Sequence, residues 1–206
     1  MTGPILISPT GLVQLMGIRF HPGGTLPFIQ LPMHEVTDRV VALELVASDL
    51  ERELMRDSEQ LKTMTERVVA VQSTLKARIR NNKTRIVDIT NRIIESGGLV
   101  SVDEVAHEAG ISTRQLERKF LDEVGVGPKL LSRILRFQQV FRAVERCDNA
   151  WAPIAIDCGY YDQAHLIRDF NQFAQQTPAV LFAEQNELTH SFTRKTRVSN
   201  FSNTDF

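Results

Sequence analysis

The spacing of apolar residues predicts a mainly helical chain from the second quarter of the sequence onward. Apolar positions recur there every three or four residues, which places them on one face of a helix. Ser48 and Glu51 have the form of a capping box that opens a first helix. A longer helix, capped by Asp57 or Ser58, then reaches about residue 81. Together they predict a helical hairpin.

The first 45 residues have a different composition. Proline and glycine are frequent, and extended runs at 12–20 and 25–31 flank the sequence HPGG. This composition predicts a strand, a turn and an irregular segment. His21 and His34 have no acidic or thiol partner at metal-ligand spacing, so they are interpreted as surface or turn residues.

An apolar stripe runs along the longer hairpin helix and has two interpretations. It contains Leu61, Met64, Val68, Val71, Leu75 and Ile79. In the first interpretation this stripe packs on the preceding helix of the same chain. In the second interpretation, the stripe packs against another copy of the protein and forms a homodimer through Leu61, Met64, Val68, Val71 and Leu75.

Basic residues follow one another between Arg67 and Val87 without an acidic residue among them. They are Arg67, Lys76, Arg78, Arg80, Lys83 and Arg85. Such a run is either a solvated helix face or, because of its place in the chain, a surface that contacts phosphates without reading bases.

A helix-turn-helix pattern follows a helix predicted over 85–96, which Gly97-Gly98 ends. Two capping boxes, Ser101 with Glu104 and Ser112 with Gln115, open two helices. The turn between them contains Gly110 where a positive φ is expected. The second of these helices faces the core with Leu116, Phe120 and Val124, and its exposed side chains are Thr113, Arg114, Glu117 and Arg118.

A long helix and a second helix-turn-helix pattern come next. The long helix begins at Pro128, ends near Cys147 and spans about 28 Å, close to the roughly 34 Å between successive major-groove faces of B-DNA. A short helix at 153–157 and a turn at Cys158-Gly159 lead to a helix opened by Asp162. That helix has Leu166, Phe170 and Phe173 on its core face and Gln163, His165, Arg168 and Asp169 on its polar face. A short helix after Thr177-Pro178 precedes an aperiodic, polar tail.

Composition and charge restrict these interpretations. Apolar and charged fractions are those of a globular protein, no apolar run is long enough to span a bilayer, and a cytoplasmic location is the default expectation. The net charge is −1, and residues 85–190 contain 11 Lys and Arg against 15 Asp and Glu. DNA binding must therefore depend on the local placement of cations. The two cysteines predict neither a disulfide framework nor a metal site.

Residues from about Arg85 to Glu184 resemble the DNA-binding domain of AraC/XylS-type transcription regulators. The motifs that carry the resemblance are EVAHEAGISTRQLERKFLDEVGVGPKLLSRILRFQQV and IAIDCGYYDQAHLIRDFNQFAQQTPAVL. The resemblance implies two helix-turn-helix units joined by a long helix. The base-facing positions that it implies are Thr113, Arg114, Glu117 and Arg118 in the first unit and Gln163, Ala164, His165, Ile167 and Arg168 in the second.

Side-chain chemistry agrees at several of these positions. Arg114 or Arg118 can donate bidentately to guanine, and Gln163 can pair with adenine. Glu117 can accept from cytosine N4 or orient a neighbouring Arg. Arg168 has a second interpretation as an ion-pair anchor, because Asp162 and Asp169 are close in sequence.

Residues 17–45 resemble the end of the amino-terminal sensing domain found in some members of the same family. A complete β-rich sensor needs on the order of 100 residues, so this region is shortened or is the end of a longer one. The expected fold class is mainly α: two helix-turn-helix units joined by a long helix, preceded by a short β or irregular segment and a helical hairpin. The expected parts are a sensor remnant at 1–45, the hairpin at 46–81, the DNA-binding domain at 82–185 and a flexible tail at 186–206.

Three classes of function follow from these features. The leading hypothesis is a sequence-specific DNA-binding transcription regulator whose partners are double-stranded DNA and RNA polymerase, without a cofactor and without a membrane. The alternative is a helical interaction module that modulates another regulator and binds DNA weakly. An enzyme is not expected, because no nucleophile–base arrangement, catalytic carboxylate pair or phosphate-binding loop is present in the sequence.

Overall fold

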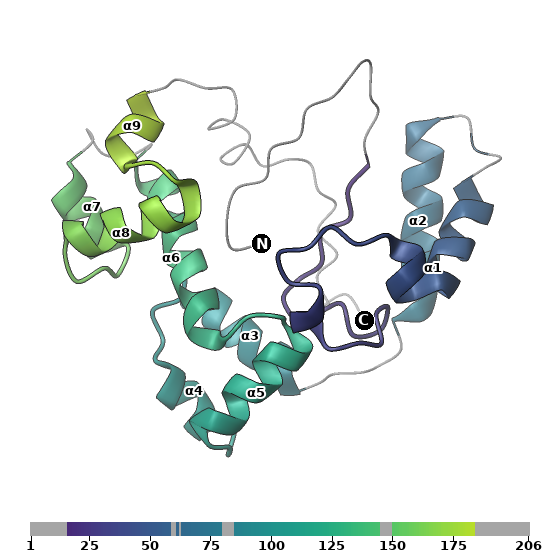
Figure 1. The fold of residues 1–206 in the computed structure, drawn as a ribbon, viewed down its shortest axis with the longest axis horizontal. Helices are drawn as coiled ribbons and strands as arrows, with labels where there is room; N and C mark the ends of the chain where they lie inside the picture. The colour runs from purple at the N-terminus through teal and green to yellow at the C-terminus, as the bar shows by residue number, and fades with distance from the viewer. Residues whose placement is uncertain (1–15, 59–60, 62, 80–84, 145–149, 184–206) are drawn as a thin grey trace. The chain divides into compact units, whose positions relative to one another are not determined.

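The computed structural model describes residues 16–58, 61, 63–79, 85–144 and 150–183. Within these ranges the regular secondary structure is helical, which confirms the mainly α fold class. The chain divides into two compact units, Met1–Arg133 and Ile134–Phe206 (Figure 1). Each unit contains one helix-turn-helix.

The expected strand is not formed by the described part of the N-terminal region. Residues 22–28 are turns, in which the amide nitrogens of Phe28 and Ile29 donate to the carbonyl of Thr25 at 2.9 and 3.0 Å. Residues 16–20 have no strand partner, and 12–15 lie outside the described residues. A short 3-10 helix, η1 (Met33–Glu35), follows the turns. The described residues of neither extended run therefore form the expected strand, whereas the expected turn and irregular segment are present.

Helices α1 (Leu43–Ser58) and α2 (Met64–Arg78) form the predicted hairpin. The helix expected from Ser48 corresponds to the part of α1 after a break at Ala47, whose backbone is not helical (φ −158°, ψ 60°). The start expected at 57–58 is wrong, because α1 continues through these positions. The N-cap of α2 is Thr63, which forms a reciprocal capping box with Glu66.

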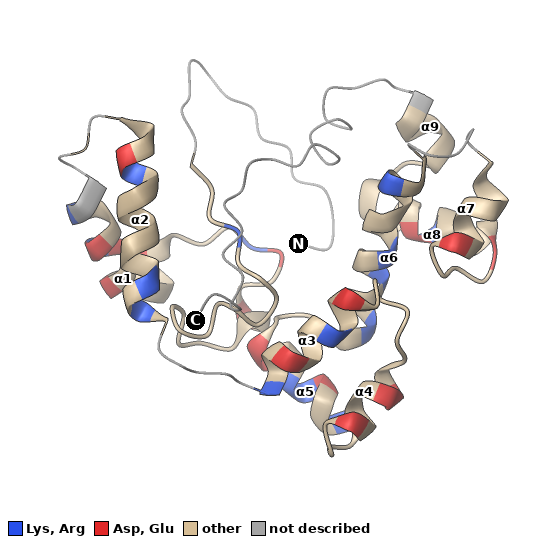
Figure 2. Cartoon of the chain, turned by 180° about the vertical axis from the view of Figure 1, so that it is seen from behind, with Lys and Arg blue, Asp and Glu red and all other residues tan. Residues whose placement is uncertain are grey.

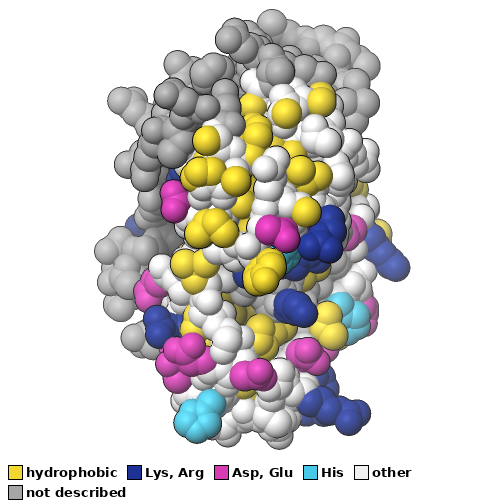
Figure 3. Space-filling view, turned by 90° about the vertical axis from the view of Figure 1, so that its left-hand side faces the viewer, with side chains coloured by type: hydrophobic (Ala, Val, Ile, Leu, Met, Phe, Trp, Pro, Cys, Tyr) yellow, Lys and Arg dark blue, Asp and Glu magenta, His cyan; other side chains and the backbone are white. Residues whose placement is uncertain are grey.

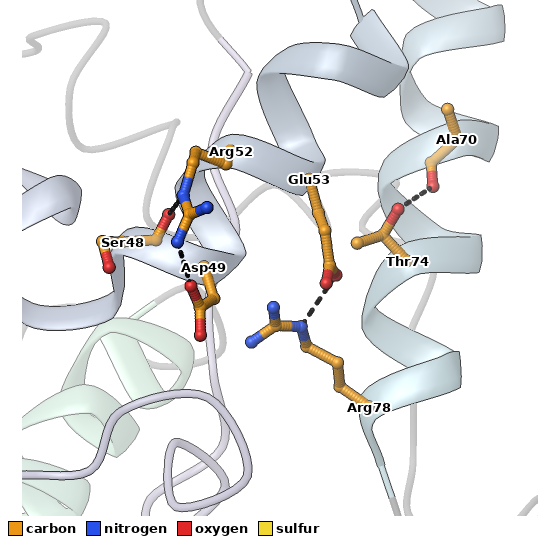
Figure 4. Close-up of polar contacts among 7 residues, drawn as sticks. All are labelled: Ser48, Asp49, Arg52, Glu53, Ala70, Thr74 and Arg78. Carbon is orange, nitrogen blue, oxygen red and sulfur yellow. Dashed lines mark hydrogen bonds and ion pairs between the residues drawn. The ribbon is translucent and has the colours of Figure 1, made fainter.

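The two hairpin helices pack side by side, as the first interpretation of the apolar stripe requires (Figure 1). Leu50 of α1 and Val71 of α2 are buried. A polar contact supports this packing: the Arg78 guanidinium of α2 donates to Glu53 of α1 at 2.9 Å, which raises the pKa of Arg78 (Figure 4). Within α2, the buried Thr74 hydroxyl donates to the Ala70 carbonyl (Figure 4). Part of the apolar stripe of α2 is therefore buried against α1 of the same chain.

The first helix-turn-helix consists of α4 (Val102–Glu108) and α5 (Thr113–Glu123), which pack on α3 (Arg85–Glu95). Both predicted caps are present, with Ser101 accepting from the Glu104 amide and Ser112 forming a complete box with Gln115. Of the predicted core residues of α5, Leu116 and Phe120 are buried, whereas Val124, just beyond the end of α5, is half-buried. Val105 and Ala106 of α4 are buried beside them.

Glycine is required where α3 ends. Gly98 has a φ of +81°, and a Cβ there would lie 2.3 Å from the carbonyl oxygen of Ser132 in α6 (Pro128–Val144). A side chain at position 98 is therefore excluded both by the backbone conformation and by the approach of α6.

The second helix-turn-helix consists of α7 (Trp151–Asp157) and α8 (Gln163–Ala174), with α9 (Pro178–Ala183) packed on α8. Helix α7 begins two residues earlier than the sequence predicted, and its last turn leads into Gly159 with a φ of +76°. An aromatic cluster holds the unit together: the Phe137 ring lies 4.7 Å from that of Phe170, and Phe182 lies 5.2 Å from Phe141. Leu166 and Phe170 are completely buried, as predicted.

Candidate DNA-binding surface

The candidate DNA-contacting residues of the first unit lie on the exposed side of α5. Arg114, Glu117 and Arg118 are exposed and form no hydrogen bond or ion pair with the described residues. An open hollow of about 350 Å³ lies beside the start of α5 and is lined by Ser112, Arg114, Gln115 and Arg118. The two arginines are therefore available for an external acceptor.

Thr113 is placed differently from the other three candidates of the first unit. Its hydroxyl donates to the Asp103 carboxylate of α4 at 2.8 Å. This bond joins the two helices of the unit at the start of α5. We therefore assign Thr113 first to holding α5 on α4; while that bond is made, its hydroxyl can accept a hydrogen bond but cannot donate one to a base.

The candidate DNA-contacting residues of the second unit lie at the start of α8. The Asp162 carboxylate accepts from the His165 amide at 2.7 Å and caps the helix. Gln163, Ala164 and Arg168 are exposed. Within the described residues no ion pair joins Arg168 to Asp162 or Asp169, so its interpretation as an ion-pair anchor has no support.

His165 and Ile167 are less accessible than the other candidates of α8. The His165 imidazole meets the Tyr160 ring edge-on at 5.2 Å, and Ile167 packs in part against the aromatic cluster. His165 is thus held in one orientation by a ring from the preceding turn. The Ile167 side chain is half-buried in the core, so only its exposed part could contact a base.

Polar groups lie beneath α8. Asp169 is buried, and so is Tyr160, whose ring lies under the Arg136 guanidinium at 5.6 Å. Burial raises the pKa of the Tyr160 hydroxyl, and the Asp169 charge raises it further, so Tyr160 remains neutral. These groups connect α6, the turn and α8 by polar contacts.

Helix α6 carries a charge pattern that the sequence analysis did not use. It contains Lys129, Arg133, Arg136 and Arg142 and no acidic residue, whereas α4 contains Asp103, Glu104 and Glu108 (Figure 2). Glu104 and Glu108 face Arg92 at 3.8 and 3.6 Å. The cations of this acidic domain are therefore concentrated on particular helices, and counting charges helix by helix would have shown it from the sequence.

The basic run before the domain is engaged within the protein at the described positions. Arg67 donates to the Leu61 carbonyl, Arg78 to Glu53, and Arg85 to the Ala109 carbonyl at 3.1 Å. Lys76 also has a partner, while Arg80 and Lys83 lie outside the described residues. These contacts favour the interpretation of the run as a helix face and an anchor of the domain.

A second hollow of about 390 Å³ lies in the hairpin, lined by Asp49, Arg52, Glu53, Arg56 and Arg78. Asp49 is paired with Arg52, and Glu53 with Arg78 (Figure 4). Because these carboxylates already neutralise two of the three arginines, the hollow is not a phosphate site.

Other kinds of site find little support in the described part of the chain. No group of three or more His, Cys, Asp or Glu side chains there can hold a metal ion. Cys158 is a free, buried thiol, and Cys147 lies outside the described residues. No helix in the described ranges is long and apolar enough to cross a membrane.

The second unit also presents apolar surface. Hydrophobic side chains gather in the upper part of the face shown in Figure 3, and Ile156 of α7 and Val180 of α9 are exposed. An apolar surface offers no hydrogen-bond donor to phosphates, so these residues are not candidates for DNA contact.

Two pairs of helices, each joined by a tight turn and each with a polar, exposed second helix, have the arrangement of helix-turn-helix units. Comparison with known families agrees: residues 105–184 match the family described as helix-turn-helix domain, and residues 1–42 match a domain of unknown function, DUF6597. The chain therefore carries an AraC-type helix-turn-helix domain after a short N-terminal region. Searches of curated proteins and of solved structures found no significant match.

Proposed function

We propose that this protein is a sequence-specific transcription regulator that inserts α5 and α8 into successive major-groove segments of one duplex. The observation that supports this proposal most directly is the free state of Arg114 and Arg118 on α5 and of Arg168 on α8. Unpaired guanidinium groups on a helix that follows a tight turn are suited to bidentate recognition of guanine. Gln163 is suited to adenine in the same way.

The place of α6 in the chain agrees with a bipartite site. Its 17 residues, about 26 Å at helical rise, follow the first helix-turn-helix in sequence and precede the second. The proposal expects half-sites separated by about one turn of DNA, roughly 34 Å. Lys129 and Arg142 are exposed on α6 and supply cations for intervening phosphates.

The remaining assignments belong to the same proposal. Glu117, Ala164, His165 and Ile167 lie on or beside the reading faces and complete the set of base-facing candidates. As a transcription regulator the protein would act in the cytoplasm and contact RNA polymerase. A homodimer through the hairpin remains the second interpretation of its stripe, in which Met64 is exposed whereas Val71 is buried.

Selection of bound sequences from a random duplex pool tests the bipartite mechanism. The expected result is two half-sites about one helical turn apart, with affinity that falls steeply as salt increases. A single short site would show that one of the two units does not read DNA. Sedimentation of the protein with the selected duplex then separates a monomer from a dimer formed through the hairpin.

A further inference from the structure

The turns of the two helix-turn-helix units are alike except for one residue. The Gly110 and Gly159 amides donate to the His107 and Ile156 carbonyls, both at 2.9 Å. The residues after these glycines also correspond, because the Ile111 amide donates to the Ala106 carbonyl and the Tyr160 amide donates to the Ala155 carbonyl. The helix cap then follows at once in the first unit, as Ser112, but only after Tyr161 in the second. Tyr161 is therefore an inserted residue.

The inserted side chain projects into solvent directly before the reading helix. Tyr161 is 88% exposed, whereas its neighbour Tyr160 is 3% exposed. The Tyr161 hydroxyl forms no hydrogen bond with the described residues. An aromatic ring with an unused donor thus stands beside the Asp162 cap and the side chain of Gln163.

The reading helix of the second unit has one Lys or Arg with which to hold a phosphate. Helix α8 contains Arg168 and the buried Asp169. Neutral donors near the start of α8 would therefore add to its contacts with the backbone. Tyrosine hydroxyls and the first amides of a helix are such donors in protein–DNA interfaces.

We propose that Tyr161 binds the DNA backbone, its hydroxyl donating to a phosphate oxygen beside the bases that α8 reads. This inference rests on the proposed function. Such a contact fixes the register of α8 in the groove and carries no sequence information of its own.

Replacing Tyr161 by Phe tests this role, because it removes the hydroxyl and keeps the ring. We expect binding to weaken about 3- to 10-fold on the selected duplex and on random duplexes alike. The slope of affinity against salt should stay at the wild-type value, because a neutral donor releases no counterion. Fluorescence anisotropy at several salt concentrations measures both quantities, and Val180→Ala in the same unit is the control.

Two results overturn the proposal. Unchanged affinity of the Tyr161→Phe protein on every duplex excludes a hydroxyl contact, and a loss confined to one sequence makes Tyr161 a base-reading residue. Failure of the wild-type protein to bind any duplex would instead overturn the proposed function.

Residues 20–38 pack on α3 and on the end of α5. The buried Thr90 hydroxyl of α3 lies 2.8 Å from the Val87 carbonyl of the same helix and 3.1 Å from the Pro22 carbonyl, so its one proton is shared between them, and the Thr37 hydroxyl donates to the Gly125 carbonyl at 2.7 Å. Phe28 is buried in this segment.

The contact with Gly125 is close. A Cβ at Gly125, just beyond the end of α5, would lie 2.6 Å from the Thr37 hydroxyl. The segment also contacts α5 through η1, with His34 3.5 Å from Asp122. These contacts lie toward the end of α5, and Arg114 and Arg118 remain exposed.

We infer that residues 20–38 are a brace through which the N-terminal region controls the position of α5. The segment includes most of the described part of the DUF6597 match, so a change in that region would reach the first reading helix directly. Regulation of DNA binding would then act on one half-site.

The double variant Thr37→Val and Thr90→Val tests the brace without touching the reading face. Hydrogen exchange should become faster in α5 and stay unchanged in α8, and this result does not depend on DNA binding. Affinity should fall about 3- to 10-fold for the selected duplex and stay unchanged for a duplex whose α5 half-site is scrambled. Thr65→Val on the exposed face of α2 is the matched control.

Unchanged exchange in α5 would overturn the brace, even if DNA binding were altered. An equal loss of affinity for both duplexes would also overturn the brace, because it would indicate a general loss of folding. A lower melting temperature of the double variant would show that loss.

Discussion

Replacing Phe170 by Ala is expected to lower the free energy of unfolding of the second unit by about 3–5 kcal/mol. The Phe170 ring is completely buried and lies 4.7 Å from the ring of Phe137 and 5.9 Å from that of Phe141. Truncation removes these contacts and leaves a cavity that close-packed neighbours fill only in part. Denaturant unfolding, followed by hydrogen exchange in each unit, measures the loss.

Because each unit has its own core, the functional effect should be confined to one half-site. Phe170→Ala should abolish discrimination at the α8 half-site and preserve it at the α5 half-site. Phe120→Ala is the matched variant in the first unit, since Phe120 is also completely buried. If hydrogen exchange became faster to the same extent in both units for either variant, the two cores would not be independent.

Replacing Arg118 or Arg168 by Ala is expected to cost about 1–3 kcal/mol of affinity for the cognate duplex, or roughly 5- to 150-fold. The reason is the loss of a bidentate contact with guanine, which a shorter side chain cannot replace. Neither arginine has an ion pair with the described residues, so stability should change by less than about 0.5 kcal/mol. Anisotropy titrations on cognate and random duplexes measure the difference.

Arg92→Ala supplies a control with the same change in charge. Arg92 is on α3 and faces Glu104 and Glu108, so its removal should leave specificity unchanged. Arg118→Lys and Arg168→Lys distinguish geometry from charge, because Lys keeps the charge and loses the planar fork. If both Ala variants bind cognate and random duplexes as the wild type does, α5 and α8 are not the reading helices.

Local sequence signals predicted the helix-turn-helix units well because their causes are local. The Ser112–Gln115 box and the Asp162 cap satisfy amides within three residues, and Gly110 adopts the expected positive φ. The burial of Leu166 and Phe170 followed from helical spacing alone. Such features need no information about distant parts of the chain.

Predictions of elements that need a partner from a distant part of the chain were wrong. The run at 25–31 has an extended pattern, but a strand requires a neighbour, and in the structure residues 25–28 are turns and Phe28 is buried. In the hairpin, the predicted cap at position 57 or 58 was wrong, and the structure uses Thr63 with Glu66, a capping box that the sequence analysis did not consider. Local propensity does not distinguish between two acceptable caps.

The start of α8, at Asp162, shows both kinds of information. The sequence by itself determined that a capped, amphipathic helix begins there and which side chains are polar, because spacing and capping are short-range. Only the tertiary structure decided that Thr113 is bonded to Asp103, that Tyr160 is buried and that Tyr161 is exposed. Those outcomes depend on which helices pack together, and neighbouring residues of the same type can therefore have opposite environments.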